Sequence, residues 1–217
     1  MTETVEQIFK SVVSQLRQKL DPLGFIVGQN GALVTGHATH IAPLAYLCRI
    51  RPGLDNDGLK GAAAEANAPL PQQYKEFLAL TNGADFFEIG LNGYTGGEVE
   101  RDPDNPSGQA VSLIYQNRFG KPDYVPKTHF CIGAMNGEFR SQGHLYIAGT
   151  GEVEMYNAHH NLIGETWPSF AVFLAAEIPR QISLHDDGGL VIPGAQLLPG
   201  DTADWEAMEE PRHQSDQ

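Results

Sequence analysis

The first twenty residues carry the apolar spacing of a helix. Their apolar side chains recur every three or four positions, which places them along one stripe of a helical surface. These side chains are Val5, Ile8, Phe9, Val12, Val13, Leu16 and Leu20. Asp21-Pro22 should end the helix, because proline disfavours helical geometry in the residue before it. The pattern therefore predicts an N-terminal amphipathic helix.

A hairpin pattern follows in residues 24–35. Two short runs typical of strands flank Asn30-Gly31, and this dipeptide suits the tight turn between two antiparallel strands. The apolar run at residues 44–50 could continue the same sheet as a third strand. The sequence leaves open whether this N-terminal part forms a subdomain or extends a larger sheet.

Helical signals return after Asp55. An Ala-rich stretch at residues 59–68 predicts a short helix, and a second helix follows it directly. The apolar face of this second helix consists of Leu70, Tyr74, Phe77 and Leu78. Gly83 suits the left-handed residue that follows a helix end. Residues 111–115 fit a strand or a short helix equally well.

Residues 128–156 have the strongest strand character. Apolar and polar positions alternate in residues 144–147 and 152–156, on either side of a Gly-rich turn. A last helix is expected to start near Thr166, with Pro168 in its first turn, and to stop at Pro179. Residues 190–192 suggest an edge strand, and a mobile acidic tail is expected from Asp201 onward.

These elements indicate an α+β protein with three parts. Residues 1–50 form an N-terminal extension of an amphipathic helix and a hairpin, and residues 51–180 form the main domain. Residues 181–217 form an acidic C-terminal extension that is expected to be partly disordered. No apolar stretch is long enough to span a bilayer, and the acidic N-terminus lacks the apolar region of a secretory signal. The expected location is therefore the cytoplasm.

Charge narrows the choice of partner. The formal net charge is −13, from 27 acidic and 14 basic residues, and most of the imbalance is local. Residues 85–104 hold six acids and one base, and residues 186–216 hold eight acids and one base. Such a field repels nucleic acid and anionic membranes and accelerates encounter with a basic protein. The alternative is that the acidic segments only keep the protein soluble.

The sequence holds few residues in patterns typical of catalysis, metal binding or cofactor binding. Cys48 and Cys131 lie in apolar contexts and are expected to be reduced, buried thiols. His37 and His40 have an HxxH spacing, and His159-His160 are adjacent, but neither pair has a third ligand at a known spacing. The sequence has no nucleotide-binding glycine motif and no nucleophile elbow. We therefore expect no catalytic residue, no metal site and no cofactor.

One ordered set of motifs points to a family. Leu70-Pro71-Gln72-Gln73-Tyr74-Lys75-Glu76-Phe77-Leu78 is similar to an LPxxYxxFL element, and Asn82-Gly83 follows it. Ile132-Gly133 and Asn136-Gly137-Glu138 resemble an "IG…NGD" stretch, with Glu138 where Asp is usual. Together with a hairpin near Leu145 and the closing Phe170…Phe173-Leu174, these motifs make residues 51–178 resemble the SUKH superfamily. That group includes yeast cell-wall synthesis regulators and many bacterial immunity proteins.

The resemblance implies a mostly antiparallel mixed sheet packed with helices, used as a protein-binding module without enzymatic activity. In bacteria such proteins bind and occlude a cognate toxin, often a nuclease, so the expected partner is a basic toxin rather than nucleic acid or membrane. The candidate binding residues are the acids Asp85, Glu88, Glu98, Glu100, Asp102 and Asp104. Two alternatives remain: an intracellular scaffold or regulatory adaptor of the same fold, and a metal-dependent hydrolase that uses the histidines.

Overall fold

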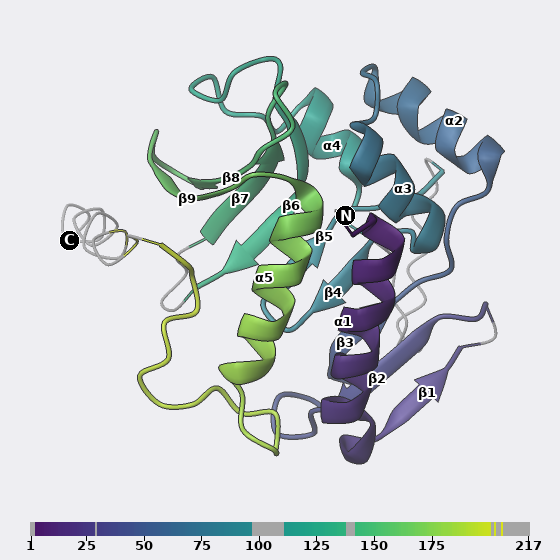
Figure 1. Ribbon diagram of the computed structural model, residues 1–217, viewed down its shortest axis with the longest axis vertical. Helices are drawn as coiled ribbons and strands as arrows, with labels where there is room; N and C mark the ends of the chain where they lie inside the picture. Colours follow the sequence, from purple (N-terminus) through teal and green to yellow (C-terminus); the bar gives the residue numbers. More distant parts are fainter. Residues whose placement is uncertain are drawn as a thin grey trace, which may run out of the picture.

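A single antiparallel sheet organises the chain. The computed structural model describes residues 3–28, 30–96, 111–137 and 142–200, together with Thr202 and Trp205. Within these residues each strand pairs with its neighbours in sequence, so the strand order in space is the order along the chain (Figure 1). The strands are β1 (Phe25–Val27), β2 (Leu33–His37), β3 (Tyr46–Ile50), β4 (Ala84–Phe86), β5 (Ile89–Leu91), β6 (Phe130–Asn136), β7 (Gln142–Ile147), β8 (Val153–Asn157) and β9 (Ile163–Trp167).

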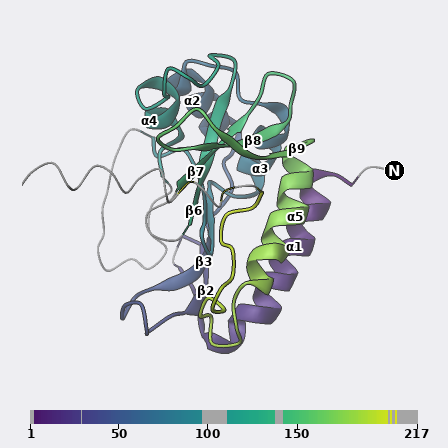
Figure 2. The same cartoon turned by 90° about the vertical axis from the view of Figure 1, so that its left-hand side faces the viewer.

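Helices from both ends of the described chain cover one face of this sheet. Figure 2 shows α1 and α5 side by side on the same side of the strands. The helices are α1 (Val5–Leu20), α2 (Asn56–Ala66), α3 (Gln72–Leu80), α4 (Leu113–Arg118) and α5 (Phe170–Ser183), and a 3-10 turn spans Asp21–Leu23. The resulting α+β architecture with an antiparallel sheet confirms the fold class expected from the sequence.

The N-terminal helix begins where its sequence supplies a cap. The Thr4 hydroxyl accepts a hydrogen bond from the Gln7 backbone N–H, and the Gln7 side chain accepts one from the Thr4 backbone N–H. This reciprocal capping box satisfies two amide donors that a helix start otherwise leaves unpaired. The predicted stripe of α1 faces the core, because Val5, Leu16 and Leu20 are buried. The predicted helix is confirmed.

The N-terminal hairpin extends the main sheet. β1 and β2 pair antiparallel across the Asn30-Gly31 turn, as the sequence predicts. β3 pairs with β2 on one side and with β4 on the other, where Cys48 lies opposite Phe86. Of the two possibilities that the sequence left open, the structure therefore shows an extension of the sheet.

Aromatic side chains of α3 and α5 fill the centre of the core. Tyr74 and Phe77 of α3 and Phe170 and Phe173 of α5 are fully buried. The Phe170 ring meets Phe77 edge-on at 5.2 Å and Tyr74 edge-on at 5.3 Å, the arrangement that aromatic quadrupoles favour. The predicted apolar face of α3 is therefore a core face.

The last helix differs from the prediction at both ends. Thr166 and Trp167 belong to strand β9, which the sequence analysis missed, and the helix begins only at Phe170 after the Ser169 cap. It also continues through Pro179 to Ser183. Pro179 has no backbone N–H, so the helix lacks one hydrogen bond there. The last turn is stabilised instead by the Arg180 guanidinium, which donates to the carbonyl oxygens of Gln196 and Leu197. The predicted boundaries were wrong because these tertiary contacts override local propensity.

Two shorter segments also differ from or refine the expectations. The segment at residues 111–115 begins helix α4, which the Ser112 hydroxyl caps. Residues 190–192 form no strand; Val191 makes only an isolated bridge with His185. In the predicted tail, Thr202 and Trp205 are buried against the domain, while the other positions from 201 onward lie outside the described residues.

The two cysteines are free and buried, as expected. Burial raises the pKa of Cys48 far above its ordinary value and raises the pKa of Cys131 to about 12. Both sulfurs are therefore neutral thiols near neutral pH. Among the described residues, no helix has the length and apolar character needed to cross a bilayer.

Candidate protein-binding site

The sheet face opposite α1 and α5 carries a row of aligned residues. Partner residues of an antiparallel ladder lie on the same face, so the pairings across β3 to β7 bring together Arg49, Asp85, Gly90, Ala134 and His144. The neighbouring positions Phe86, Ile89 and Met135 point to the other face, into the core. The aligned row therefore faces away from the two long helices.

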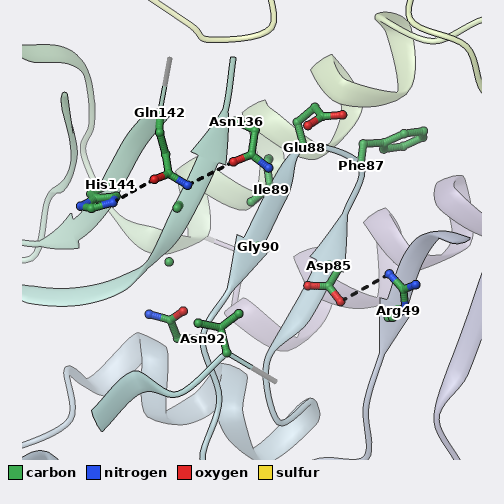
Figure 3. Close-up of a pocket in the computed structure, with 13 residues that line it drawn as sticks. Arg49, Asp85, Phe87, Glu88, Ile89, Gly90, Asn92, Asn136, Gln142 and His144 are labelled. Carbon is green, nitrogen blue, oxygen red and sulfur yellow. Dashed lines mark hydrogen bonds and ion pairs between the residues drawn. The ribbon is translucent and has the colours of Figure 1, made fainter. Parts of the chain in front are cut away.

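Small residues make this row hollow at its centre. Gly90 and Ala134 lie between longer side chains and form the floor of an open cleft of about 400 Å³ (Figure 3). The strands β5 and β6 approach so closely here that a Cβ at Gly133 would lie 2.1 Å from the Gly90 carbonyl oxygen. Only glycine fits at position 133, because any Cβ there would collide with the backbone of β5. This close approach explains the glycine of the Ile132-Gly133 motif.

Polar side chains from several strands line the cleft. The Gln142 amide nitrogen donates to the Asn136 side-chain oxygen at 3.2 Å, and the His144 Nε2 lies 3.3 Å from the Gln142 side-chain oxygen. Burial, with a smaller contribution from His159, lowers the pKa of His144. Among the described residues, the buried Nδ1 of His144 has no hydrogen-bond partner. This chain of amides and imidazole can donate to and accept from a polar group of a bound partner.

The predicted acid Asp85 lies inside the cleft but is already paired. Its carboxylate accepts from the Arg51 guanidinium at 2.8 Å, and the Arg49 guanidinium lies 4.0 Å away. These two arginines offset its charge, so Asp85 contributes less negative field than its sequence suggests.

The predicted acid Glu88 lies at the rim of the same cleft, in the turn between β4 and β5. No base lies within ion-pair distance of its carboxylate in the part of the chain that the structure describes. Its backbone carbonyl accepts from the Asn136 amide, which fixes the turn against β6. The structure therefore brings Asp85 and Glu88 together at one cleft.

The other four predicted acids, Glu98, Glu100, Asp102 and Asp104, lie outside the described residues. The described residues on either side of this acidic segment are nevertheless held together. The Gly93 amide donates to the Val111 carbonyl at 2.8 Å, and Val111 and Asn92 both line the cleft. The described residues before and after residues 97–110 therefore meet beside the cleft.

Sequence analysis missed the residues Arg49, Gln142 and His144. The signal that could have found them is strand alternation: each is a polar residue next to apolar positions in a strand that buries its other face. Which strands would be neighbours, and hence which polar residues would meet, does not follow from that alternation alone.

The histidine pairs do not form a ligand set in the structure. The His37 ring stacks on Tyr46 at 4.9 Å, and its Nε2 lies 2.9 Å from the Pro43 carbonyl oxygen. Within residues 3–28, 30–96, 111–137 and 142–200, no group of three His, Cys, Asp or Glu side chains could hold a metal ion. The cleft itself offers hydrogen-bonding and charged groups suited to recognition of a protein surface.

Comparison with known proteins identifies the family of the chain. The model of the SMI1 / KNR4 family (SUKH-1) matches residues 53–176, which is more than half of the chain. A search of curated proteins found no match. The matched region runs from just before α2 into α5 and includes the core aromatics of α3 and α5 as well as most of the cleft. The chain therefore belongs to the SMI1 / KNR4 (SUKH-1) family.

Proposed function

We propose that this protein is a non-enzymatic immunity protein, which binds a basic cognate toxin such as a nuclease and occludes its active surface. Membership of the SUKH-1 family fits an immunity or a regulatory domain. The observation that favours immunity is an open cleft where Gly93 and Val111, which flank the acid-rich residues 98–104 in the sequence, are hydrogen-bonded to each other.

The charges around the cleft support a basic partner. Residues 85–104 hold six acids against one base, and Glu88 stands at the rim of the cleft without an ion-pair partner among the described residues. A basic active site that normally holds phosphate would be attracted to such a surface, and the attraction would speed association. Polar side chains in the cleft, Gln142 and His144 among them, would then supply directional hydrogen bonds.

The test starts with a tagged full-length chain, used to isolate partners from its native host at low and moderate salt. We expect one basic partner near stoichiometry, whose toxicity in co-expression the chain suppresses. Recovery of no such partner, or failure to suppress its toxicity, would contradict the proposal.

A charge-reversal series then examines the surface. Reversal of the acidic segment, Glu98→Lys with Glu100→Lys, should slow association about tenfold or more, with a smaller change in dissociation. The matched control is Glu209→Lys with Glu210→Lys, which changes the net charge equally but lies far along the chain. Equal slowing by both pairs would show that only the overall field matters.

A second candidate function, a regulatory adaptor, is favoured by the edge strand β1. All three of its residues are exposed, and Phe25 and Val27 keep 53% and 63% of their surfaces accessible. An unpaired edge with apolar side chains can receive a strand from another protein. Phe25→Ser with Val27→Ser should abolish partner binding if the adaptor function holds, and should leave toxin binding unchanged if the immunity function holds.

A further inference from the structure

A second groove is lined by residues at the start of β6, the end of β7, the end of α4 and the start of α3. Figure 1 shows where these elements lie in the fold. It has a volume of about 820 Å³ and shares no lining residue with the cleft described above. The connection between α2 and α3 forms one wall, and the segment from α4 to β6 forms another. Its basic lining residues are Arg118, Lys121, Lys127 and His129.

The charge of this groove is opposite to that of the whole molecule. No acidic side chain is among its described lining residues, although the chain carries a net charge of −13. Three of the lining bases, Arg118, Lys121 and Lys127, have no ion pair in the part of the chain that the structure describes. The described lysines and arginines that do have a carboxylate within 4.0 Å are Lys10, Arg17, Lys19, Arg49, Arg51, Lys60 and Arg180. Of the other lysines and arginines that the structure describes, Lys75 alone lies outside the groove.

Local contacts hold the basic segment in place. The Lys121 ammonium donates to the backbone carbonyl oxygens of Lys127 and His129, so it ties the segment before β6 to the strand without neutralising its charge. Two carboxylates close to the rim are already engaged. The Glu154 side chain accepts from His129 at 2.9 Å, and the Glu152 side chain accepts from Thr150 at 2.6 Å.

Apolar surface accompanies the charge. Phe119 keeps 69% of its surface exposed at the groove, and the Arg118 guanidinium lies 5.2 Å from the centre of its ring. Leu70 and Phe130 add apolar lining. A large exposed aromatic side chain beside unpaired bases is typical of surfaces that bind other proteins.

We propose that this groove binds an acidic peptide segment of a partner protein, with carboxylates near Arg118 and Lys127 and an apolar side chain on Phe119. The volume exceeds what an inorganic anion fills and suits a few residues of an extended chain. A long polyanion such as nucleic acid would extend beyond the groove and meet the repulsive field of the remaining surface. The proposal is independent of the toxin proposed above, because the two sites share no residue.

The test uses the full chain and a fluorescein-labelled peptide of about ten glutamates with one central leucine, read by fluorescence anisotropy at low salt. We expect Arg118→Glu with Lys127→Glu to weaken binding about tenfold or more, since both side chains are exposed and unpaired. Phe119→Ala should weaken binding of this peptide but not of an all-glutamate peptide. The matched control is Lys60→Glu with Lys75→Glu, which changes the net charge equally outside the groove and should alter binding less than about twofold.

Four results would overturn the proposal. The wild-type chain could fail to bind the peptide, or both double variants could weaken binding equally. A thymidine oligonucleotide of similar length could displace the peptide at equal concentration, which would indicate nucleic acid instead. Neutralisation of the chain's own acids with Glu206→Gln, Glu209→Gln and Glu210→Gln could tighten peptide binding tenfold while an equal charge change, Glu3→Gln with Glu6→Gln and Asp57→Asn, does not, which would show that the chain fills its own groove.

Discussion

At the scale of single residues, the Tyr74 hydroxyl joins three elements in the core. Its oxygen lies 2.5 Å from the Asn92 carbonyl oxygen and 3.0 Å from the Ile132 carbonyl oxygen, within donating distance of both. Complete burial raises its pKa, so the hydroxyl stays a donor. We expect Tyr74→Phe to lower the free energy of unfolding by about 1–3 kcal/mol, because the Asn92 carbonyl oxygen loses its hydroxyl donor, while the Ile132 carbonyl oxygen keeps the Asn92 backbone N–H. Urea denaturation measures this change, and the exposed Tyr115→Phe is the control; equal midpoints for both variants and wild type would contradict it.

A second prediction at this scale concerns the pH dependence of folding stability, to which His144 should contribute. Its folded-state pKa lies below the ordinary value of 6.5, so the unfolded chain binds this proton at a higher pH than the folded chain does. The stabilising contribution of the neutral ring is complete above about pH 6.5 and is lost as the pH falls toward the lower folded value. Between about pH 7.5 and pH 5.5, wild type should lose more stability than His144→Gln. Parallel pH profiles of the urea midpoint would exclude this role.

At the scale of elements, Pro179 shows how tertiary contacts extend a helix. The proline lies inside α5 and removes one amide donor from its interior. Because the turns on both sides are already helical, Pro179→Ala should restore a hydrogen bond and raise the free energy of unfolding by about 1–2 kcal/mol. Thermal and urea unfolding measure the gain, with the loop variant Pro126→Ala as the control. A loss of stability would mean that the proline fits its backbone better than alanine does.

Local patterns predicted the elements that bury one regular face, and missed those defined by their neighbours. α1, the β1–β2 hairpin and α3 follow from apolar spacing and turn chemistry within a few residues. The short strands β4, β5 and β9 do not follow from local patterns. Each is defined by its hydrogen bonds to a neighbouring strand, and its own few residues do not specify that neighbour. The cleft was found only in part for the same reason: Asp85 stood out by charge, but its pairing with Arg51 depends on the register of β3 and β4.

At the scale of the whole molecule, α1 is part of the domain core and not a detachable extension. It packs against α5 and α3, and Val5, Val12 and Leu16 are among its buried side chains. Leu16→Ala should therefore cost about 2–5 kcal/mol, a large share of the stability of an ordinary domain. Guanidinium unfolding measures this cost, and the exposed Gln18→Ala on the same helix should change little. A small effect of Leu16→Ala would show that α1 adds little to the fold.

The arrangement of charge also belongs to this scale. The cleft proposed to bind a toxin and the basic groove proposed to bind an acidic peptide share no lining residue. Because the surfaces are separate, a mutation in one of them should abolish binding of its partner and leave binding at the other surface unchanged. The Lys127→Glu and Glu98→Lys variants, combined with their controls, therefore examine the two proposals independently.

The strand order has a consequence for the order of events during synthesis. Strands that pair with their sequence neighbours can add to a growing sheet one after another as the chain leaves the ribosome, although the β3–β4 and β5–β6 pairs wait for the helices between them. Helix α1 precedes the strands, whereas α5 follows all the strands of the described sheet. Part of the apolar stripe of α1 can be covered early by α3, where Phe77 meets Phe9 at 5.7 Å, but the part that packs on α5 stays uncovered until that helix has been synthesised.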